Sequence, residues 1–201
     1  ADVVEHPWIP EKDTDPKYAT PKEAHLLRLI TGESDEPCRL ISSNLRRAIS
    51  TCAIALRERL DKNTTQDKIL ILGELQEASI NPDALSIHPA HSPLVTAFTD
   101  SNRVKEIYAT QCDTTQNVGN KPLNSNGLVR MEAFCKLLFP DDATEKSAGI
   151  TVNNVLCTGH SYWFRAFFQT YMPRSFPHAC KPKKLVLGGV AGFSMLPTKT
   201  K

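Results

Sequence analysis

The stretch CRLISSNLRRAISTCAIALRERL, residues 38–60, contains two elements of different periodicity. Its first six residues form a short β-rich run between a proline and an asparagine, which is typical of a buried strand. From residue 45 onward, apolar residues recur every three or four positions, which places them on one face of a helix. These residues are Leu45, Ile49, Cys52, Leu56 and Leu60. The stretch therefore predicts a strand followed directly by an amphipathic helix.

The same alternation of strand and helix patterns continues on both sides of this stretch. A further helix begins at Thr20–Pro21 and stops at Gly32, because a capping residue with proline starts helices and glycine ends them. Other helices are predicted over residues 127–139 and 161–172, and other strands over 68–77 (with a loop), 151–160 and 183–195 (with a glycine turn). Such alternation predicts an α/β fold, a three-layer α/β/α sandwich with a mostly parallel central sheet.

The length of 201 residues fits a single domain, 1–201. The segment at about 78–125 differs from the rest because it is rich in Pro, Asn, Thr and Asp, with one helical pattern near SNRVKEIYATQ (101–111). We expect this segment to be an insertion or cap over one end of the sheet, where substrate specificity often resides.

The composition excludes several classes of protein. A net charge of +2 favours neither a nucleic-acid partner nor a membrane surface. No apolar stretch approaches the roughly 20 residues that cross a bilayer. The six cysteines form no CxxC pair and lie mostly in apolar runs, which predicts free thiols, a cytoplasmic location and no structural zinc. A secreted protein with three disulfides is the alternative.

Polar residues follow three of the predicted strands directly. Arg47 comes shortly after the first strand, Glu77 after the second, and His160 with Ser161 after the strand at 151–160. Because ligands of open α/β sheets bind at the carboxyl ends of the strands, we expect these side chains to converge at one edge. Two helices also begin there, and helix N-termini favour anions such as phosphate. The topology therefore predicts an anion site without specifying a reaction.

Four motifs resemble those of the histidine phosphatase superfamily, which is also called phosphoglycerate mutase-like. SNLRRAIST (43–51) resembles the family's S-x-L-x-R-A-x-x-T motif, and LQE (75–77) resembles its short acidic motif. VLCTGHSYWFR (155–165) is similar to the late motif that holds the second active-site histidine, and TDPKYATPKEAHLL (14–27) is similar to an early Asp-x-Pro segment. The resemblance covers about residues 13–190, with the motifs in the family's order.

This resemblance implies hydrolysis of phosphomonoesters through a phosphohistidine, with no metal and no cofactor. It implies that Arg47 binds the phosphate through paired hydrogen bonds, while His160 and the backbone N–H of Ser161 bind the transferring group. It further implies that Glu77 protonates the leaving group, with a pKa raised by its pocket. Arg46 falls outside the motif position and is expected to be solvated or salt-bridged. The implied substrate is a phosphorylated small molecule or a phosphopeptide, and mutase activity is the less favoured reaction.

The chain departs from the family at its nucleophile. The family's Arg-His-Gly tripeptide does not occur, and the nearest string is VVEHP (3–7), where Glu5 and Pro7 flank His6. Three alternatives follow. The tripeptide lies upstream of Ala1, or His6 is a degenerate nucleophile, or the protein is an inactive relative that binds phosphorylated ligands or protein partners.

Each candidate residue also has an ordinary structural interpretation. Arg47 alone would pass for a surface arginine, and His160 for a buried structural histidine. Glu77 competes with the nearby Glu74 for the role of acid. His88 and His91 have a metal-like spacing, but they lie in a Pro-rich loop, so we predict no metal site there. The identity of the substrate and the oligomeric state are left open by the sequence.

Overall fold

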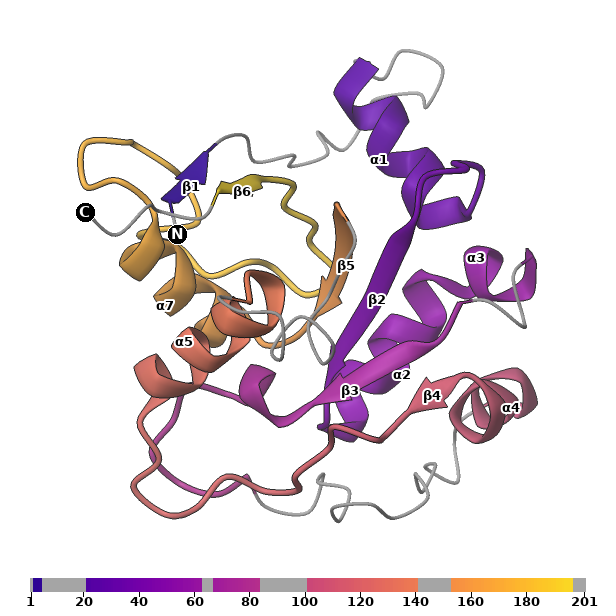
Figure 1. Ribbon diagram of the computed structural model, residues 1–201, viewed down its shortest axis with the longest axis horizontal. Coiled ribbons are helices and arrows are strands. Elements are labelled where there is room, and N and C mark those ends of the chain that lie inside the picture. The colour runs from indigo at the N-terminus through magenta and orange to yellow at the C-terminus, as the bar shows by residue number, and fades with distance from the viewer. Residues whose placement is uncertain (1, 5–20, 63–66, 84–100, 141–152, 197–201) are drawn as a thin grey trace. The chain divides into compact units, whose positions relative to one another are not determined.

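The computed structural model describes residues 2–4, 21–62, 67–83, 101–140 and 153–196 (Figure 1). Contacts divide the chain into two compact units. One comprises residues 28–160, and the other comprises residues 1–27 together with 161–201. In the described part of the chain, no helix is long and apolar enough to cross a membrane.

The unit of residues 28–160 is built on a four-stranded, wholly parallel sheet with the order β4-β3-β2-β5. The strands are β2 (Cys38–Ser43), β3 (Ile69–Leu72), β4 (Cys112–Asp113) and β5 (Asn154–Thr158). In register, Ile41 of β2 lies opposite Leu70 of β3 and Cys157 of β5. The predicted α/β fold with a parallel sheet is confirmed.

Helices precede or connect these strands. They are α1 (Pro21–Thr31), which spans the boundary between the units, α2 (Arg46–Ala55), α3 (Arg57–Lys62), α4 (Asn102–Thr110) and α5 (Gly127–Leu138), with a short 3-10 helix η2 (Gly73–Leu75). The predicted end of α1 at Gly32 is confirmed. Gly32 has a φ of 72°, a left-handed conformation that favours glycine, and the N–H of Glu33 then donates to the carbonyl of Arg28 at 2.8 Å.

The helix predicted from residue 45 to residue 60 is broken in the structure. Leu56 leaves the helical conformation with φ −103° and ψ 16°, and it separates α2 from α3. The apolar face nevertheless continues across the break, because all five residues predicted to share it are at most 4% exposed. Burial of that face, rather than an unbroken hydrogen-bond ladder, is what the sequence pattern specifies.

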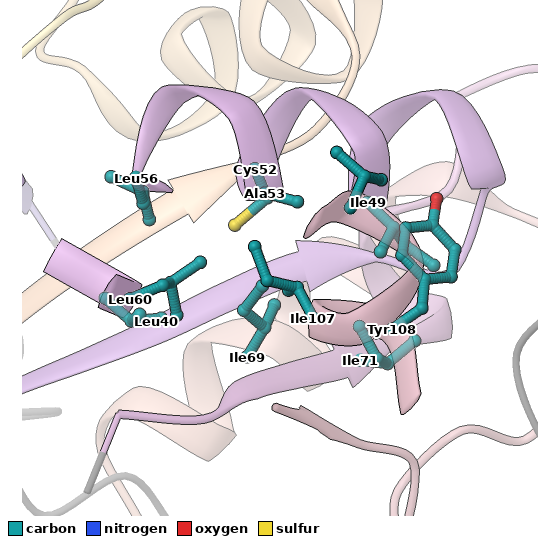
Figure 2. Close-up of a cluster of buried hydrophobic side chains, with 11 residues drawn as sticks. Leu40, Ile49, Cys52, Ala53, Leu56, Leu60, Ile69, Ile71, Ile107 and Tyr108 are labelled. Atoms are coloured by element: carbon teal, nitrogen blue, oxygen red, sulfur yellow. The ribbon is translucent and has the colours of Figure 1, made fainter. Parts of the chain in front are cut away.

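The main hydrophobic cluster lies between one face of the sheet and helices α2, α3 and α4 (Figure 2). Leu40 of β2 and Ile69 and Ile71 of β3 contribute the sheet side of this cluster. Since side chains alternate along a strand, the intervening Ile41 and Leu70 point to the opposite face, and they are buried as well. Burial on both faces is the pattern expected for the interior of a parallel sheet.

Part of the segment at 78–125 belongs to the sheet. Helix α4 leads into β4, whose residues Cys112 and Asp113 pair in parallel with Ile69 and Leu70 of β3. Residues 84–100 lie outside the described residues. That the segment acts as an insertion or cap stays a prediction.

The other unit contains a two-stranded antiparallel sheet, in which β1 (Asp2–Val4) pairs with β6 (Ser194–Leu196), and the helix α7 (Ser161–Tyr171). Aromatic side chains of α7 form its core, with Trp163 stacked on Phe167 at 5.1 Å. The strand predicted over 183–195 is wrong for its first half. Residues 186–189 form a turn closed by a 2.9 Å hydrogen bond from the N–H of Gly189 to the carbonyl of Val186. Only the end of the predicted segment enters a strand.

Candidate functional site

His160 and Ser43 meet at the carboxyl edge of the parallel sheet. Ser43 is the last residue of β2, and His160 follows β5 after one glycine, so the pairing of these strands brings both to the same edge. The His160 Nε2 lies 3.0 Å from the Ser43 Oγ, and the histidine is only 6% exposed. Ser43, the first residue of the SNLRRAIST stretch, and His160 of the later motif therefore lie side by side at this edge.

The environment of His160 favours the neutral imidazole. Burial lowers the pKa of His160 from its ordinary value to about 4, and the positive charges of Arg47 and Lys121 act in the same direction, against the carboxylate of Asp83. At neutral pH the ring is uncharged. One histidine, two cations and one carboxylate therefore interact at this edge of the sheet.

Arg47 lies in the first turn of α2 with half of its side chain exposed. Its Nη2 is 4.0 Å from the Oδ1 of Asp83, which is a long contact for an ion pair. The first turn of α2 contains no acidic residue, and no side chain caps it. A helix N-terminus carries a partial positive charge, which disfavours cations there. Arg46 and Arg47 therefore sit where their charge is locally unfavourable, and a bound anion would relieve this.

The two arginines at the start of α2 differ in exposure. Arg46, predicted to be solvated or salt-bridged, is the more buried of the pair, and its Nε has no hydrogen-bond partner among the described residues. The Arg46 carbonyl accepts a 3.0 Å hydrogen bond from the Tyr108 hydroxyl, which fixes the start of α2 against α4. Arg47 is the arginine that faces solvent, which is what a ligand-binding side chain requires.

Lys121 and Asp83 are members of this site that the sequence did not indicate. The Lys121 side chain is 1% exposed, and its Nζ donates to the Asp83 Oδ2 at 2.7 Å, to the Glu77 carbonyl at 2.7 Å and to the Ser79 Oγ at 3.1 Å. Both residues lie in loops. Since loops have no periodicity, no pattern signals their burial.

A buried amide network fixes the loop that carries Lys121. The Asn44 Nδ2 donates to the Asn117 Oδ1 at 2.9 Å and to the Gly119 carbonyl at 2.7 Å, while its Oδ1 accepts from the Gln76 Nε2 at 2.6 Å. The Gln76 Oε1 in turn accepts from the Lys121 N–H at 2.9 Å. The network joins residues directly after β2 and β3 to the loop at 117–121, so the strand ends determine where the Lys121 side chain lies.

Glu77, the predicted acid, interacts with Ala78, Lys121 and Arg130. Its Oε1 accepts from the Ala78 N–H at 3.2 Å, and its carbonyl accepts from Lys121 and, at 3.0 Å, from the Arg130 Nη2. Its negative charge acts on Arg130, together with those of Asp83 and Glu74. Burial raises the pKa of Glu74, which is a closer match to the environment expected for a general acid. The carboxylate whose charge acts on His160 is that of Asp83.

The remaining predicted site residues lie in the other unit or outside the described residues. Ser161 is the first residue of α7 and belongs to the other unit, so its role stays a prediction. His6, His88 and His91 lie outside the described residues. The strand that precedes His6, β1, pairs with β6 and is not part of the parallel sheet. Within the described ranges, no group of three or more His, Cys, Asp or Glu side chains is placed to hold a metal ion.

No protein-family model, curated protein or solved structure matches this chain. The chemistry of the site is therefore inferred from its own residues and from the motif resemblance.

Proposed function

We propose that the edge of the sheet at Ser43, Arg47 and His160 binds the phosphate of phosphomonoesters, and that the complete enzyme hydrolyses them through a phosphohistidine without a metal. The observation that carries this proposal is the placement of two cations beside a buried neutral histidine. Arg47 and Lys121 both disfavour protonation of His160. A phosphate dianion reverses that electrostatic effect, because an opposite charge nearby favours the protonated ring.

The side chains suit a tetrahedral oxyanion. Arg47 is exposed and only loosely held by Asp83, so its planar guanidinium is available for two parallel hydrogen bonds to phosphate oxygens. His160, once protonated by proton uptake on binding, donates to a phosphate oxygen and stabilises the charge of the transferring group. The partial positive charge at the N-terminus of α2 adds to the same potential.

The covalent step needs a second histidine, since His160 is the one histidine in the described part of the 28–160 unit. The resemblance implies that this nucleophile ends a strand with the sequence Arg-His-Gly. Strand β5 is at the edge of the parallel sheet, and among the described residues no strand pairs with its outer side. A strand ending in Arg-His-Gly that paired with this side would bring its histidine to the carboxyl ends of the sheet.

The second candidate function is a binding protein without turnover. It is favoured by the string VVEHP, in which Glu5 stands where a phosphate-binding arginine is expected. In that case the site at His160 binds phosphorylated small molecules or phosphopeptides and releases them unchanged.

Binding is tested by calorimetric titration of the chain with inorganic phosphate. Arg47→Ala and His160→Ala are each expected to weaken binding at least tenfold. The matched control is Arg57→Ala, which removes another exposed arginine at the start of a helix, α3, and should change affinity less than twofold. Equal affinities for all four proteins would refute the proposed site.

Turnover is tested with p-nitrophenyl phosphate, using the protein together with any residues that precede Ala1 in its gene. We expect slow hydrolysis that EDTA does not affect, an acid-labile phosphoryl-protein intermediate, and loss of activity in His160→Ala. Activity abolished by EDTA would contradict the metal-independent mechanism. Phosphate binding that depends on Arg47 but gives no turnover would establish the binding protein instead.

A further inference from the structure

The candidate site contains a carboxylate, Asp83, although a nearby negative charge disfavours the binding of phosphate. Asp83 lies between the two cations, with its Oδ2 2.7 Å from the Lys121 Nζ and its Oδ1 4.0 Å from the Arg47 Nη2. Its charge also acts on His160, in the direction opposite to that of both cations. Asp83 is thus an internal anion that interacts with both cations and with the histidine.

Asp83 is held more tightly by Lys121 and Asn120 than by Arg47. Asn120 contacts the backbone of Asp83, donating from Nδ2 to its carbonyl at 3.3 Å and accepting from its N–H at 3.4 Å. Together with the short bond from the buried Lys121, this holds the Asp83 carboxylate in place. Arg47, by contrast, is half-exposed and reaches Asp83 only at the limit of an ion pair. The side chain that can move is Arg47.

Arg47 therefore has two alternative partners, the Asp83 carboxylate and an incoming anion. A phosphate that binds Arg47 must replace the Asp83 contact and must also bind close to the negative charge of Asp83. Both effects weaken phosphate binding. Because Lys121 keeps its own bonds to Asp83, Ser79 and the Glu77 carbonyl, the carboxylate stays in the site when Arg47 turns away.

We propose that Asp83 is an internal counter-ion that competes with phosphate for Arg47 and so sets the affinity of the site. This inference rests on the proposed function, since it describes how the same site selects its ligand. Because the Asp83 charge repels a doubly charged phosphate more strongly than a singly charged anion, it narrows the preference of the site for the doubly charged ligand. Asp83 is in this sense a specificity-determining residue.

The test is the affinity of Asp83→Asn for inorganic phosphate, measured by calorimetric titration. The asparagine keeps an oxygen that can accept from Lys121 and removes only the charge. We expect phosphate binding at least tenfold tighter than in the unchanged protein, with a smaller gain for a singly charged probe, phenylphosphonate monomethyl ester, than for phosphate. The matched control is Asp61→Asn, which removes one negative charge from the exposed pair with Arg103 and should change affinity less than twofold.

Competition for Arg47 is separated from a general charge effect by a double-mutant cycle. In the Arg47→Ala background, Asp83→Asn should raise affinity less than threefold, because the contested side chain is gone. Thermal unfolding of each variant confirms that it is folded. If Asp83→Asn folds poorly, Asn120→Ala, which releases the Asp83 backbone without changing charge, should also tighten binding.

The outcomes separate the two proposals. Phosphate binding that depends on Arg47 but is no tighter in folded Asp83→Asn overturns the counter-ion and leaves the proposed function intact. An equal gain with and without Arg47 also overturns the competition. Absence of phosphate binding in every folded variant overturns the proposed function and the counter-ion with it.

Discussion

Replacement of Lys121 by methionine tests the architecture of the site. Methionine has a similar length but no charge, so the Asp83 carboxylate, which is 14% exposed, loses its closest cation. The Glu77 carbonyl and the Ser79 Oγ lose a hydrogen bond each. Removing one partner of a buried ion pair costs about 3–5 kcal/mol, because the other charge is left without compensation. We therefore expect the free energy of unfolding to fall by about 4 kcal/mol.

The assay is urea unfolding followed by circular dichroism at pH 7. The control, Lys136→Met, removes a lysine that is 58% exposed and 3.8 Å from Glu132, and it should cost less than about 1 kcal/mol. The double variant Lys121→Met/Asp83→Asn should recover part of the loss, since no isolated charge remains. A Lys121→Met protein as stable as the control would refute the buried ion pair and the loop placement on which the site depends.

Three further predictions concern the same unit. Arg59→Met removes the Nε contact to the Asp67 Oδ2 at 2.7 Å and a 2.6 Å hydrogen bond to the Leu29 carbonyl, and in urea unfolding it should cost about 3–5 kcal/mol. Ile49→Ala opens a cavity in the cluster of Figure 2 and should cost about 2–5 kcal/mol in the same assay, whereas Ile49→Val should cost about 1 kcal/mol; equal losses would contradict the packing. His160→Gln should reduce the loss of stability on acidification. The folded-state pKa of about 4 lies below the unfolded value, so the unfolded chain takes up the proton first and stability falls as pH drops from about 6.5 to 4, by up to about 3 kcal/mol in the unchanged protein. Denaturant titrations at pH 7 and pH 4 measure this difference, and an identical decrease in both proteins would contradict the buried neutral histidine.

The regular elements around the site could be predicted because each buries an apolar face. The run at 38–43 and the spacing from Leu45 to Leu60 specify a buried strand and a buried helical face, and both are present. The break at Leu56 could not be predicted, since the apolar spacing is the same whether the helix continues or bends. The segment at 183–187 resembles a strand in composition, but its chain turns at Gly188, which has a φ of 73°.

The candidate site was predictable only where its residues follow strands. Arg47 and His160 follow the ends of β2 and β5, which pair in parallel, and the charge of Arg47 acts on His160. Lys121 and Asp83 are placed by side-chain hydrogen bonds between two loops, which leave no periodic trace in the sequence. Glu77 also follows a strand, β3, yet its carbonyl accepts from Arg130 and its charge acts on Arg130. Position after a strand does not determine which way a loop side chain turns.

The titration of His160, followed by NMR of its ring protons with and without phosphate, tests the central claim most directly. We predict a pKa of about 4 in the free protein, where burial and the two cations disfavour the charged ring. Saturating phosphate should raise that pKa by more than about 1.5 units, because the bound anion stabilises the imidazolium. In Arg47→Ala, higher phosphate concentrations should be needed for the same shift. A pKa near 6.5 in the free protein, or one that phosphate leaves unchanged, would contradict the proposed site.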